Sequence, residues 1–363
     1  MILAAFTGLT EHGGVQRYAR HAAAVIAMVA RQRGEQFHLL TLNDPAGPLE
    51  FESAGIRFCA TGFARNRTAL IRAILTKARE TRLLYLNHPN LAPLGLALRA
   101  LNPAARYVVS THGFEVWEPL PTMRRFGLRC ASKVTATAQF NAAKAVRIQG
   151  ITSDKVVLIP CALDPEFSGA NGAEHRSSDE GKPPMLLTVA RLMSAAHGVY
   201  KGIDTVIEAL PGVLGSHPGL LYVVVGSGDD LPRLQTLANR TGVATSVKFT
   251  GAVDSVVLRE YLAASDVFVM PSRTEGFGFV FLEAMAFGKP VIGGNHGGTP
   301  EIWPDGSAGF LVDYSDLRTL ADRLKMLLAD SDLRRRMGVE GRRRVAEFFS
   351  FDRFRENFAP LFA

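Results

Sequence analysis

Short apolar runs alternate with longer amphipathic stretches along almost the whole chain. The short runs are rich in Val, Ile, Leu and Phe and end at polar or glycine-containing turns, which predicts buried strands. The longer stretches, such as residues 15–33, 69–80 and 141–149, repeat apolar residues at helical spacing and predict helices. The predicted strands are residues 2–6, 37–41, 83–86, 107–111, 134–137, 156–159, 185–189, 221–225, 248–250, 267–270 and 290–292. This alternation predicts an α/β fold with parallel sheets covered by helices.

One polar stretch, residues 169–184, interrupts the pattern and is rich in Gly, Pro and Ser, as linkers are. A chain of 363 residues is also longer than one hydrophobic core normally serves. We therefore predict two doubly wound, Rossmann-like domains, residues 1–168 and 185–349, with a cleft between them. A last helical pattern carries Phe at positions i, i+3 and i+7, so one of its faces must be buried. We expect residues 350–363 to pack back on the first domain.

The net charge of +7 is distributed unevenly, because residues 1–165 contain 20 Lys and Arg against 10 Asp and Glu. Two sets of cations recur at regular spacing: Arg125, Arg129 and Lys133, and Arg65, Arg72 and Arg79. If these segments are helical, each set forms a stripe. A stripe is either a solvated helix face or a surface for an anionic partner, such as a membrane or a phosphate-bearing acceptor. Nucleic acid is not expected, because no aromatic-interleaved basic motif occurs.

The remaining composition indicates a reducing compartment. No apolar run approaches the roughly 18 residues that a membrane span requires. The N-terminus enters an apolar strand without a basic segment before it, so no secretory signal is predicted. The cysteines, Cys59, Cys130 and Cys161, have no disulfide or metal-site spacing. We expect a cytoplasmic protein, peripheral on the inner face of the plasma membrane if the basic first half meets lipid.

The strongest chemical signal follows the predicted strand at residues 267–270. A glycine-broken turn comes next and opens an apolar helix, with Glu275 in the turn and Glu283 in the helix. Backbone N–H groups at a helix start can bind phosphate, and carboxylates can accept hydrogen bonds from sugar or ribose hydroxyls. A nucleotide-sugar site needs both kinds of group, so this segment predicts an enzyme.

Two cations follow another strand of the second half. Arg191 ends the strand at residues 185–189, and Lys201 opens the next helix. The carboxyl ends of strands face the ligand in open α/β sheets. There, two cations can neutralise a diphosphate, although unrelated surface cations are the simpler interpretation.

Two glycine turns are less specific. Gly13 and Gly14 open the first helix, where glycines let a ligand approach the backbone, but a plain tight turn is as good an interpretation. Their spacing does not fit the dinucleotide fingerprint. The turn at residues 226–228 follows the strand at 221–225 and favours a structural role, with Asp229 or Asp230 as the helix cap.

Histidines supply the other candidates. His112 lies between a strand end and a glycine, where it could meet a substrate hydroxyl, whereas a lone His is more often a satisfied polar residue. His88 and His296 are weaker candidates of the same kind. The single D-x-D string, residues 330–332, precedes a charged helix and is better explained as a helix N-cap than as a metal site. No metal is therefore expected.

With these residues assembled, the chain resembles the family 4 glycosyltransferases of GT-B fold over nearly its full length. The most specific segment is the one that carries Glu275 and Glu283, residues 271–292. The other matching motifs are Gly13-Gly14-Val15, His112-Gly113, Arg191 with Lys201-Gly202, Gly226-Ser227-Gly228, Phe249-Thr250-Gly251 and Gly297-Gly298-Thr299-Pro300-Glu301. The resemblance implies a UDP- or GDP-sugar as co-substrate in the C-terminal domain and a saccharide or lipid-linked acceptor in the N-terminal domain. It also implies retaining, metal-independent hexose transfer without a cofactor, in cell-surface polysaccharide synthesis.

The same resemblance assigns roles to individual residues. Those near the chemistry are His112, Glu275, Arg191 and Lys201, and those that bind substrate are Gly13, Gly14, Gly226, Gly251, Phe277, Gly278, Glu283, Gly298 and Thr299. It implies that Arg191 and Lys201 hold the donor diphosphate and that Glu283 holds the ribose. Glu275 would position sugar hydroxyls and act electrostatically rather than as a nucleophile.

The chain departs from the family pattern in three places. Nine residues separate Arg191 from Lys201, a longer gap than usual, as in a subset whose loop ends in Tyr-Lys-Gly. Residues 160–164 read Pro-Cys-Ala-Leu-Asp, and Ala138 stands where serine is usual. Two other functions share the architecture: a sugar-nucleotide epimerase, which needs no acceptor, and a non-catalytic two-domain ligand binder.

Overall fold

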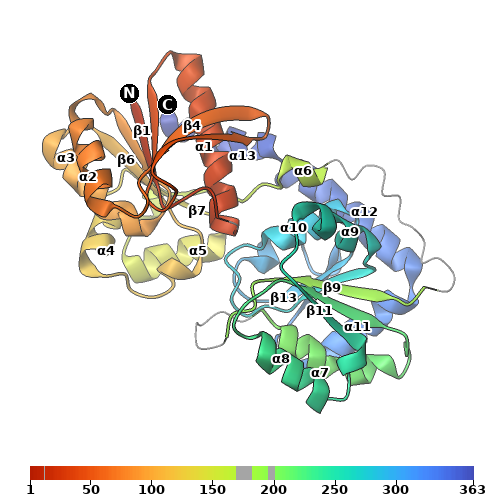
Figure 1. Ribbon diagram of the computed structural model, residues 1–363. Coiled ribbons are helices and arrows are strands. Elements are labelled where there is room, and N and C mark those ends of the chain that lie inside the picture. The colour runs from red at the N-terminus through yellow and green to blue at the C-terminus, as the bar shows by residue number, and fades with distance from the viewer. Residues whose placement is uncertain (12, 169–181, 195–200) are drawn as a thin grey trace. The chain divides into compact units, whose positions relative to one another are not determined.

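The computed structural model describes residues 1–11, 13–168, 182–194 and 201–363. The chain divides into two compact units, which are Met1–Asp164 with Ser350–Ala363, and Pro165–Phe349. Most of the predicted linker, residues 169–184, lies outside the described residues. Within each unit, helices cover both faces of one sheet (Figure 1).

Unit 1 contains an eight-stranded sheet of order β3-β4-β2-β1-β5-β6-β7-β8. Its strands are β1 Ile2–Phe6, β2 Phe37–Thr41, β3 Gly47–Ser53, β4 Ile56–Gly62, β5 Leu83–Leu86, β6 Arg106–Ser110, β7 Lys133–Ala136 and β8 Val156–Leu158. Its α-helices are α1 Gly14–Arg33, α2 Arg67–Thr76, α3 Ala92–Leu101, α4 Thr122–Arg129, α5 Gln139–Lys144 and α13 Phe351–Phe358. Short helices include η1 Ala78–Glu80, η2 Pro89–Leu91, η3 Phe114–Val116 and η4 Ala145–Gln149, which has π geometry. All neighbouring strands are parallel except β3 and β4.

The antiparallel hairpin β3–β4 was not predicted. Its residues alternate between exposed and less exposed positions, because one face of this edge hairpin meets solvent. Such a strand carries no continuous apolar run, and Pro48, Glu50 and Glu52 further dilute the signal. The central strands behave differently: all residues of β1 are buried on both faces, so their apolar runs are easily recognised.

The two predicted cation stripes do not exist. Helix α4 ends at Arg129, and Lys133 already begins β7. The side chains of Arg125 and Arg129 instead donate to the carbonyl oxygen of Gln149, over 3.1 and 2.7 Å, and so cap the end of η4. The second set lies before, within and after α2: Arg65, Arg72 and Arg79. The cations do recur at helical spacing in the sequence, but turns interrupt both segments, so neither set lies on one helix.

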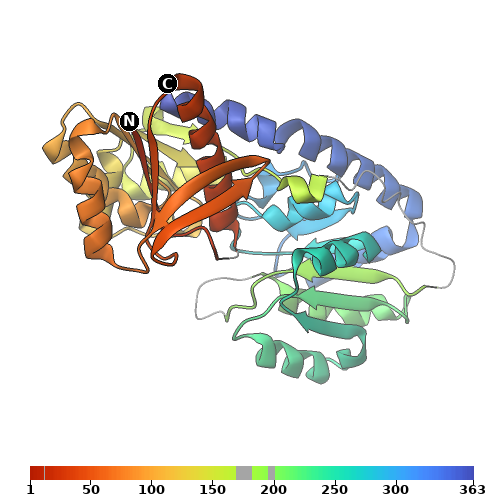
Figure 2. The ribbon, with the colours of Figure 1, turned by 45° about the horizontal axis from the view of Figure 1, so that its top comes forward.

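The C-terminal helix α13 packs on the first unit through its aromatic face. Phe354 and Phe358 are buried. The ring of Phe354 lies 5.2 Å from that of Tyr18 in α1, and the ring of Phe358 lies 5.3 Å from that of Tyr85 in β5, both edge to face. Such pairs are worth about 0.5–1.5 kcal/mol beyond their burial. Both chain termini therefore lie in unit 1 (Figure 2).

Unit 2 contains a six-stranded parallel sheet of order β11-β10-β9-β12-β13-β14. Its strands are β9 Met185–Val189, β10 Leu221–Val225, β11 Val247–Gly251, β12 Val267–Met270, β13 Val291–Gly294 and β14 Gly309–Val312. Its α-helices are α6 Pro165–Ser168, α7 Ile203–Leu214, α8 Leu231–Arg240, α9 Ser255–Ala264, α10 Phe279–Ala286, α11 Leu317–Ala329 and α12 Ser331–Phe348, and its short helices are η7 Ala244–Ser246 and η8 Thr299–Glu301. The edge strand β14 was not predicted, because its apolar run is only three residues long after a glycine.

Both sheets have a topological switch point. In unit 1, β1 lies between β2 and β5, and in unit 2, β9 lies between β10 and β12. Chain connections run in opposite directions from such a point, so the loops that follow the two central strands separate and leave room for a ligand. Candidate site residues are therefore expected after β1 and β5, and after β9 and β12.

Candidate functional site

The switch point of unit 2 brings two predicted site residues into contact. Glu275 lies in the loop after β12, and Lys201 lies just before the N-cap of α7. The Nζ atom of Lys201 is 2.6 Å from Oε2 of Glu275, and their side chains are only 21% and 14% exposed. This is a charge-assisted hydrogen bond at the carboxyl edge of the sheet.

Glycine conformations make this contact possible. Gly202, the N-cap of α7, has φ 74°, and a Cβ there would lie 2.3 Å from the carbonyl oxygen of Pro271. Gly278, the N-cap of α10, has φ 109°, and a Cβ there would lie 2.6 Å from the ring of Phe281. A side chain at Gly202 would force the two loops apart, and one at Gly278 would disturb the first turn of α10.

The loop after β13 packs against the same carboxylate loop. The backbone N–H of Gly298 donates to the carbonyl oxygen of Glu275 over 2.8 Å, and Thr299 follows as a buried residue. Glu283 lies in α10 and is 1% exposed. The side chain of Phe277 is buried, with its ring 5.6 Å from that of Phe349, so its backbone is left for the role that the resemblance assigns.

The loop after β9 carries Arg191, and the predicted glycine turn supports it. The backbone N–H of Leu192 donates to the carbonyl oxygen of Ser227 over 3.0 Å. A Cβ on Gly226 would lie 1.8 Å from the carbonyl oxygen of Ala190. The turn is thus needed for packing, and it places Arg191. The carbonyl oxygen of Gly251, whose φ is 75°, accepts a hydrogen bond from the N–H of Gly226 over 2.9 Å. Gly251 ends β11, which lies beyond β10 in the sheet and so further from Lys201.

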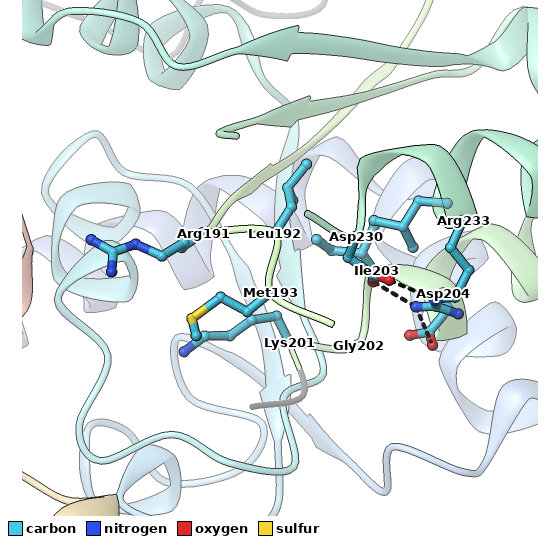
Figure 3. Close-up of a pocket in the computed structure, with 10 residues that line it drawn as sticks. Arg191, Leu192, Met193, Lys201, Gly202, Ile203, Asp204, Asp230 and Arg233 are labelled. Carbon is cyan, nitrogen blue, oxygen red and sulfur yellow. Dashed lines mark hydrogen bonds and ion pairs between the residues drawn. The ribbon is translucent and has the colours of Figure 1, made fainter. Parts of the chain in front are cut away.

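A pocket lies beside these residues. Arg191, Met193 and Lys201 extend toward one side of it, and an ion-pair cluster closes the other side (Figure 3). There, the guanidinium of Arg233 binds both carboxylate oxygens of Asp230 over 2.7 Å and one oxygen of Asp204 over 3.2 Å. Asp230 is the N-cap residue of α8, but its carboxylate serves Arg233 rather than the helix backbone. The cluster fixes the first turns of α7 and α8 to each other.

In unit 1, the loop after β1 leads to Gly13 and Gly14 at the N-terminus of the 20-residue helix α1. A buried carboxylate orders this loop. Asp44 accepts hydrogen bonds from the backbone N–H groups of Leu9 and Thr10 and from the hydroxyl of Thr10, over 2.7 to 3.1 Å. Sequence analysis missed Asp44, although a polar residue soon after β2 was a usable signal, because carboxyl ends of neighbouring parallel strands meet.

The loops after β5 and β6 meet at His112. Its Nε2 is 2.7 Å from the backbone carbonyl oxygen of Asn87, which can only accept, so Nε2 carries the proton and Nδ1 is left as an acceptor. Asn87 was also missed; its amide oxygen accepts from the N–H of Thr7 over 2.8 Å and so joins the loops after β1 and β5. The ring of Tyr18 packs edge-on against His112, at 4.9 Å between centroids.

The surroundings of His112 and of its neighbour His88 favour neutral imidazole rings. Burial lowers the pKa of His112 below its ordinary 6.5, against the opposing effect of Glu115. Burial likewise lowers the pKa of His88 to about 4. The two rings stack, with 6.3 Å between their centroids. A neutral imidazole at pH 7 can accept a proton or a hydroxyl hydrogen bond at Nδ1.

Other sequence candidates have structural partners. His296 lies 3.1 Å from the carboxylate of Asp313 in unit 2. The unusual segment 160–164 ends in Asp164, whose carboxylate is 2.8 Å from Nε2 of the buried His21. Burial alone would raise the pKa of Asp164, but the His21 hydrogen bond and nearby positive charges hold it below its ordinary value. Ala138, where serine is usual, is the N-cap of α5 and offers no side-chain cap.

Neither a metal-ion site nor a membrane-spanning helix is found in the described part of the chain. Among the residues that the structure describes, no three His, Cys, Asp or Glu side chains converge as ion ligands do. Asp330 of the D-x-D string is the N-cap of α12 and accepts from the N–H of Leu333 over 2.7 Å, which confirms the helix-cap interpretation. None of the described helices has the length and apolarity to cross a bilayer.

Comparison with known proteins gives consistent family assignments for both halves. A family model described as "Glycosyl transferase 4-like domain" matches residues 13–162, and one described as "Glycosyl transferases group 1" matches residues 172–344. The chain is 37% identical over 277 residues to the GDP-mannose-dependent alpha-(1-6)-phosphatidylinositol monomannoside mannosyltransferase of Mycobacterium tuberculosis, covering 72% of this chain and 71% of that one. It is 32% identical over 280 residues to the corresponding monoacylated-substrate enzyme of Corynebacterium glutamicum, with 72% and 71% covered.

Solved structures agree on the fold. HepE of Anabaena in complex with UDP matches with a TM-score of 0.75 at 19% identity, covering 99% of each chain. Sucrose-phosphate synthase of Thermosynechococcus elongatus matches with a TM-score of 0.75 at 22% identity, covering 99% of this chain and 98% of that one. The chain therefore belongs to the group 1, family 4 glycosyltransferases and has their GT-B fold, as its motifs predict.

Proposed function

We propose that this glycosyltransferase moves a hexose from a nucleoside diphosphate sugar to a lipid-linked saccharide, with retention of anomeric configuration and without a metal ion. The observation that carries the proposal is the contact between Lys201 and Glu275 at the switch point of unit 2. A donor of this class places an anionic diphosphate next to a hydroxyl-rich sugar. An ammonium group suits the first, and a carboxylate suits the second.

GDP-mannose is the proposed donor, with UDP-sugars as the next candidates. The mycobacterial and corynebacterial relatives are GDP-mannose-dependent by name, and the Anabaena structure contains UDP. A thermal-shift panel of GDP, UDP and ADP with their sugars would rank them. A nucleotide at 100 times its Kd adds about 2.7 kcal/mol to the free energy of unfolding, which is readily measured.

The proposal assigns the leaving group to protein cations. As the bond between the sugar and the diphosphate breaks, negative charge grows on the phosphate oxygens. Arg191 and Lys201 border one pocket, where they can stabilise that charge. The N–H groups at the start of α1, next to Gly13 and Gly14, are a further place for an anion. Metal independence stays a prediction that EDTA can test.

Retention follows from the role proposed for Glu275. Its carboxylate, once the diphosphate binds Lys201, would accept hydrogen bonds from sugar hydroxyls and so position the sugar rather than attack it. The acceptor hydroxyl would instead attack from the face that the diphosphate leaves. The new glycosidic C–O bond forms as the sugar–phosphate C–O bond breaks, and the hydroxyl proton passes to the departing phosphate. Retaining hydrolases differ, because a carboxylate attacks in them.

Unit 1 is the proposed acceptor-binding unit. His112, held neutral and with Nδ1 as an acceptor, could bind a hydroxyl of the sugar near the reaction. The named substrates of the two bacterial relatives are phosphatidylinositol mannosides, so a glycolipid headgroup is the acceptor that we propose. With such an acceptor, we propose a peripheral location at the inner face of the plasma membrane.

The direct test is product analysis. The enzyme is incubated with GDP-mannose, vesicles that contain phosphatidylinositol monomannoside, and EDTA, and the product is examined by proton NMR. We expect a new α-mannosidic bond at an undiminished rate. A β-linked product or loss of activity in EDTA would overturn the retaining, metal-independent mechanism. An isomerised nucleotide sugar without a new glycosidic bond would identify an epimerase instead.

A further inference from the structure

Large apolar side chains are exposed close together in one segment of unit 1. Phe114 of η3 is 64% exposed, and Met123 and Phe126 of α4 are 60% and 54% exposed. A soluble protein seldom leaves several large apolar side chains in one exposed cluster without a partner. We refer to these three residues as the η3–α4 surface. Nothing in the proposed transfer chemistry uses them.

This exposure is built into the fold. Met123 and Phe126 are three residues apart and share one exposed face of α4, while Gly127, beside Met123, is buried at the border of that face and Leu128 is buried behind it. A Cβ on Gly127 would lie 2.7 Å from the backbone of Ala92, so α4 cannot rotate to hide its apolar face. The helix is therefore fixed with Met123 and Phe126 outward.

A buried glutamine fixes η3 relative to α4. The amide nitrogen of Gln149 donates to the carbonyl oxygens of Val116 and Glu118 over 2.9 and 2.6 Å, and its amide oxygen accepts from the N–H of Leu120 over 3.1 Å. Gln149 is completely buried. Phe114 and α4 thus belong to one rigid platform, which adjoins α5 (Figure 1).

The segment that carries the surface is cationic, and aromatic side chains accompany it. Residues 113–150 contain six Lys or Arg against two Glu. The ammonium of Lys144 lies 5.4 Å from the ring centroid of Phe140, whose ring is 5.3 Å from that of the partly buried Trp117. Apolar side chains that enter a bilayer, with tryptophan and cations around them, are the features of an interfacial membrane contact. A segment with a net positive charge complements anionic phospholipid headgroups.

We propose that the η3–α4 surface docks unit 1 on a bilayer that contains anionic phospholipid. Helix α4 packs on η2, which follows His88, and Arg124 is close enough to influence the pKa of His88. Docking would therefore bring lipid headgroups to the edge of the sheet that carries His112. This consequence for the acceptor rests on the proposed function, whereas the docking itself does not.

The test is flotation of the full-length protein with vesicles of phosphatidylcholine alone or with 30% phosphatidylglycerol. Met123→Ser with Phe126→Ser changes only exposed side chains, and Val256→Ser with Phe348→Ser in unit 2 is the matched control. We expect wild type and control to bind anionic vesicles, and the α4 variant to bind with a partition coefficient at least tenfold lower. Equal binding by the α4 variant, equal binding to both vesicles, or no binding by wild type would each overturn the proposal.

Two further readouts separate docking from catalysis. The chain has two tryptophans, and Trp303 is fully buried, so a blue shift of fluorescence on anionic vesicles reports Trp117 beside η3. Slow hydrolysis of GDP-mannose in vesicle-free solution should be the same for wild type and the α4 variant. If hydrolysis is absent while vesicle binding persists, GDP-mannose is not the donor, and the docking proposal still holds. If the variant changes oligomeric state but not vesicle binding, the surface is a protein interface and the proposal is wrong.

Discussion

The Lys201–Glu275 contact pairs two opposite charges that a bound donor could separate. Its diphosphate would bind Lys201, and its sugar hydroxyls would bind Glu275. In the structure, the ammonium of Lys201 donates to the carboxylate of Glu275 over 2.6 Å, so each group has a hydrogen-bond partner. A bound diphosphate would compete for the ammonium and leave the carboxylate available for hydroxyl groups. The pair thus gives the two residues separable roles, one in binding the phosphate and one in positioning the sugar.

Glu275→Ala should separate these roles. We expect turnover to fall at least 100-fold, because the sugar loses its positioning carboxylate. The Kd for GDP should stay within threefold of wild type, because Lys201 remains and no longer has a competing partner. Transfer rates and titration calorimetry measure the two effects. Asp322→Ala, which removes the exposed 3.0 Å pair with Lys325, is the control and should change neither. A Glu275→Ala enzyme of normal turnover would remove Glu275 from the site.

His88 gives a pH prediction. Its pKa of about 4 in the folded protein is below the ordinary 6.5, so the unfolded chain binds more protons between these values. The stability that His88 contributes is therefore complete above about pH 6.5 and lost as the pH falls toward 4. From pH 7 to pH 5 this amounts to about 2 kcal/mol. Urea unfolding at both pH values should show a difference smaller by about that amount in His88→Asn. An unchanged difference would contradict the lowered pKa.

Site residues differ in how well the sequence could reveal them. Glu275 and Glu283 stand in a segment whose residue order is itself distinctive, so their prediction needed no structure. Asp44 and Asn87 act through loops that meet only because β2, β1 and β5 are neighbours. A polar residue soon after a strand is a usable signal, but it does not say which loops meet. Such supporting residues become visible only once the strand order is known.

At the scale of elements, buried parallel strands and the edge strands β8 and β11 were predicted, whereas the edge hairpin β3–β4 and the edge strand β14 were missed. Strands buried on both faces, such as β1 and β12, gave continuous apolar runs. The hairpin β3–β4 alternates and was missed, and the cation stripes failed because helical spacing continued across real turns. Helix α13 was predicted correctly because three phenylalanines on one face leave few alternatives to burial.

The aromatic packing of α13 supports a stability prediction. Phe358→Ala removes a fully buried ring that touches Tyr85, so we expect a loss of about 3–5 kcal/mol in the free energy of unfolding of unit 1. Phe348→Ala is the matched control, since that ring is 45% exposed on α12 and should cost no more than about 0.5 kcal/mol. Chemical denaturation followed by tryptophan fluorescence would measure both, because Trp117 lies in unit 1 and Trp303 in unit 2. Equal effects would mean that α13 does not complete the core of unit 1.

At the scale of the whole molecule, the chain is built twice on one plan. Each unit has a parallel sheet with a switch point, and at each switch point the loops are ordered by buried hydrogen bonds or glycine contacts. Unit 2 gathers cations and carboxylates, and unit 1 gathers neutral histidines and a helix N-terminus. This division fits a donor with a charged leaving group and an acceptor with a neutral hydroxyl.

The most direct test of the account is titration of GDP and GDP-mannose into wild type and Lys201→Ala, with EDTA present throughout. We predict that wild type binds both ligands in EDTA and that Lys201→Ala binds them at least tenfold more weakly, because a charge-assisted contact with the diphosphate is lost. Equal affinities for the two proteins, or wild-type binding that returns only when a divalent metal is added, would contradict the claim that protein cations hold the donor diphosphate.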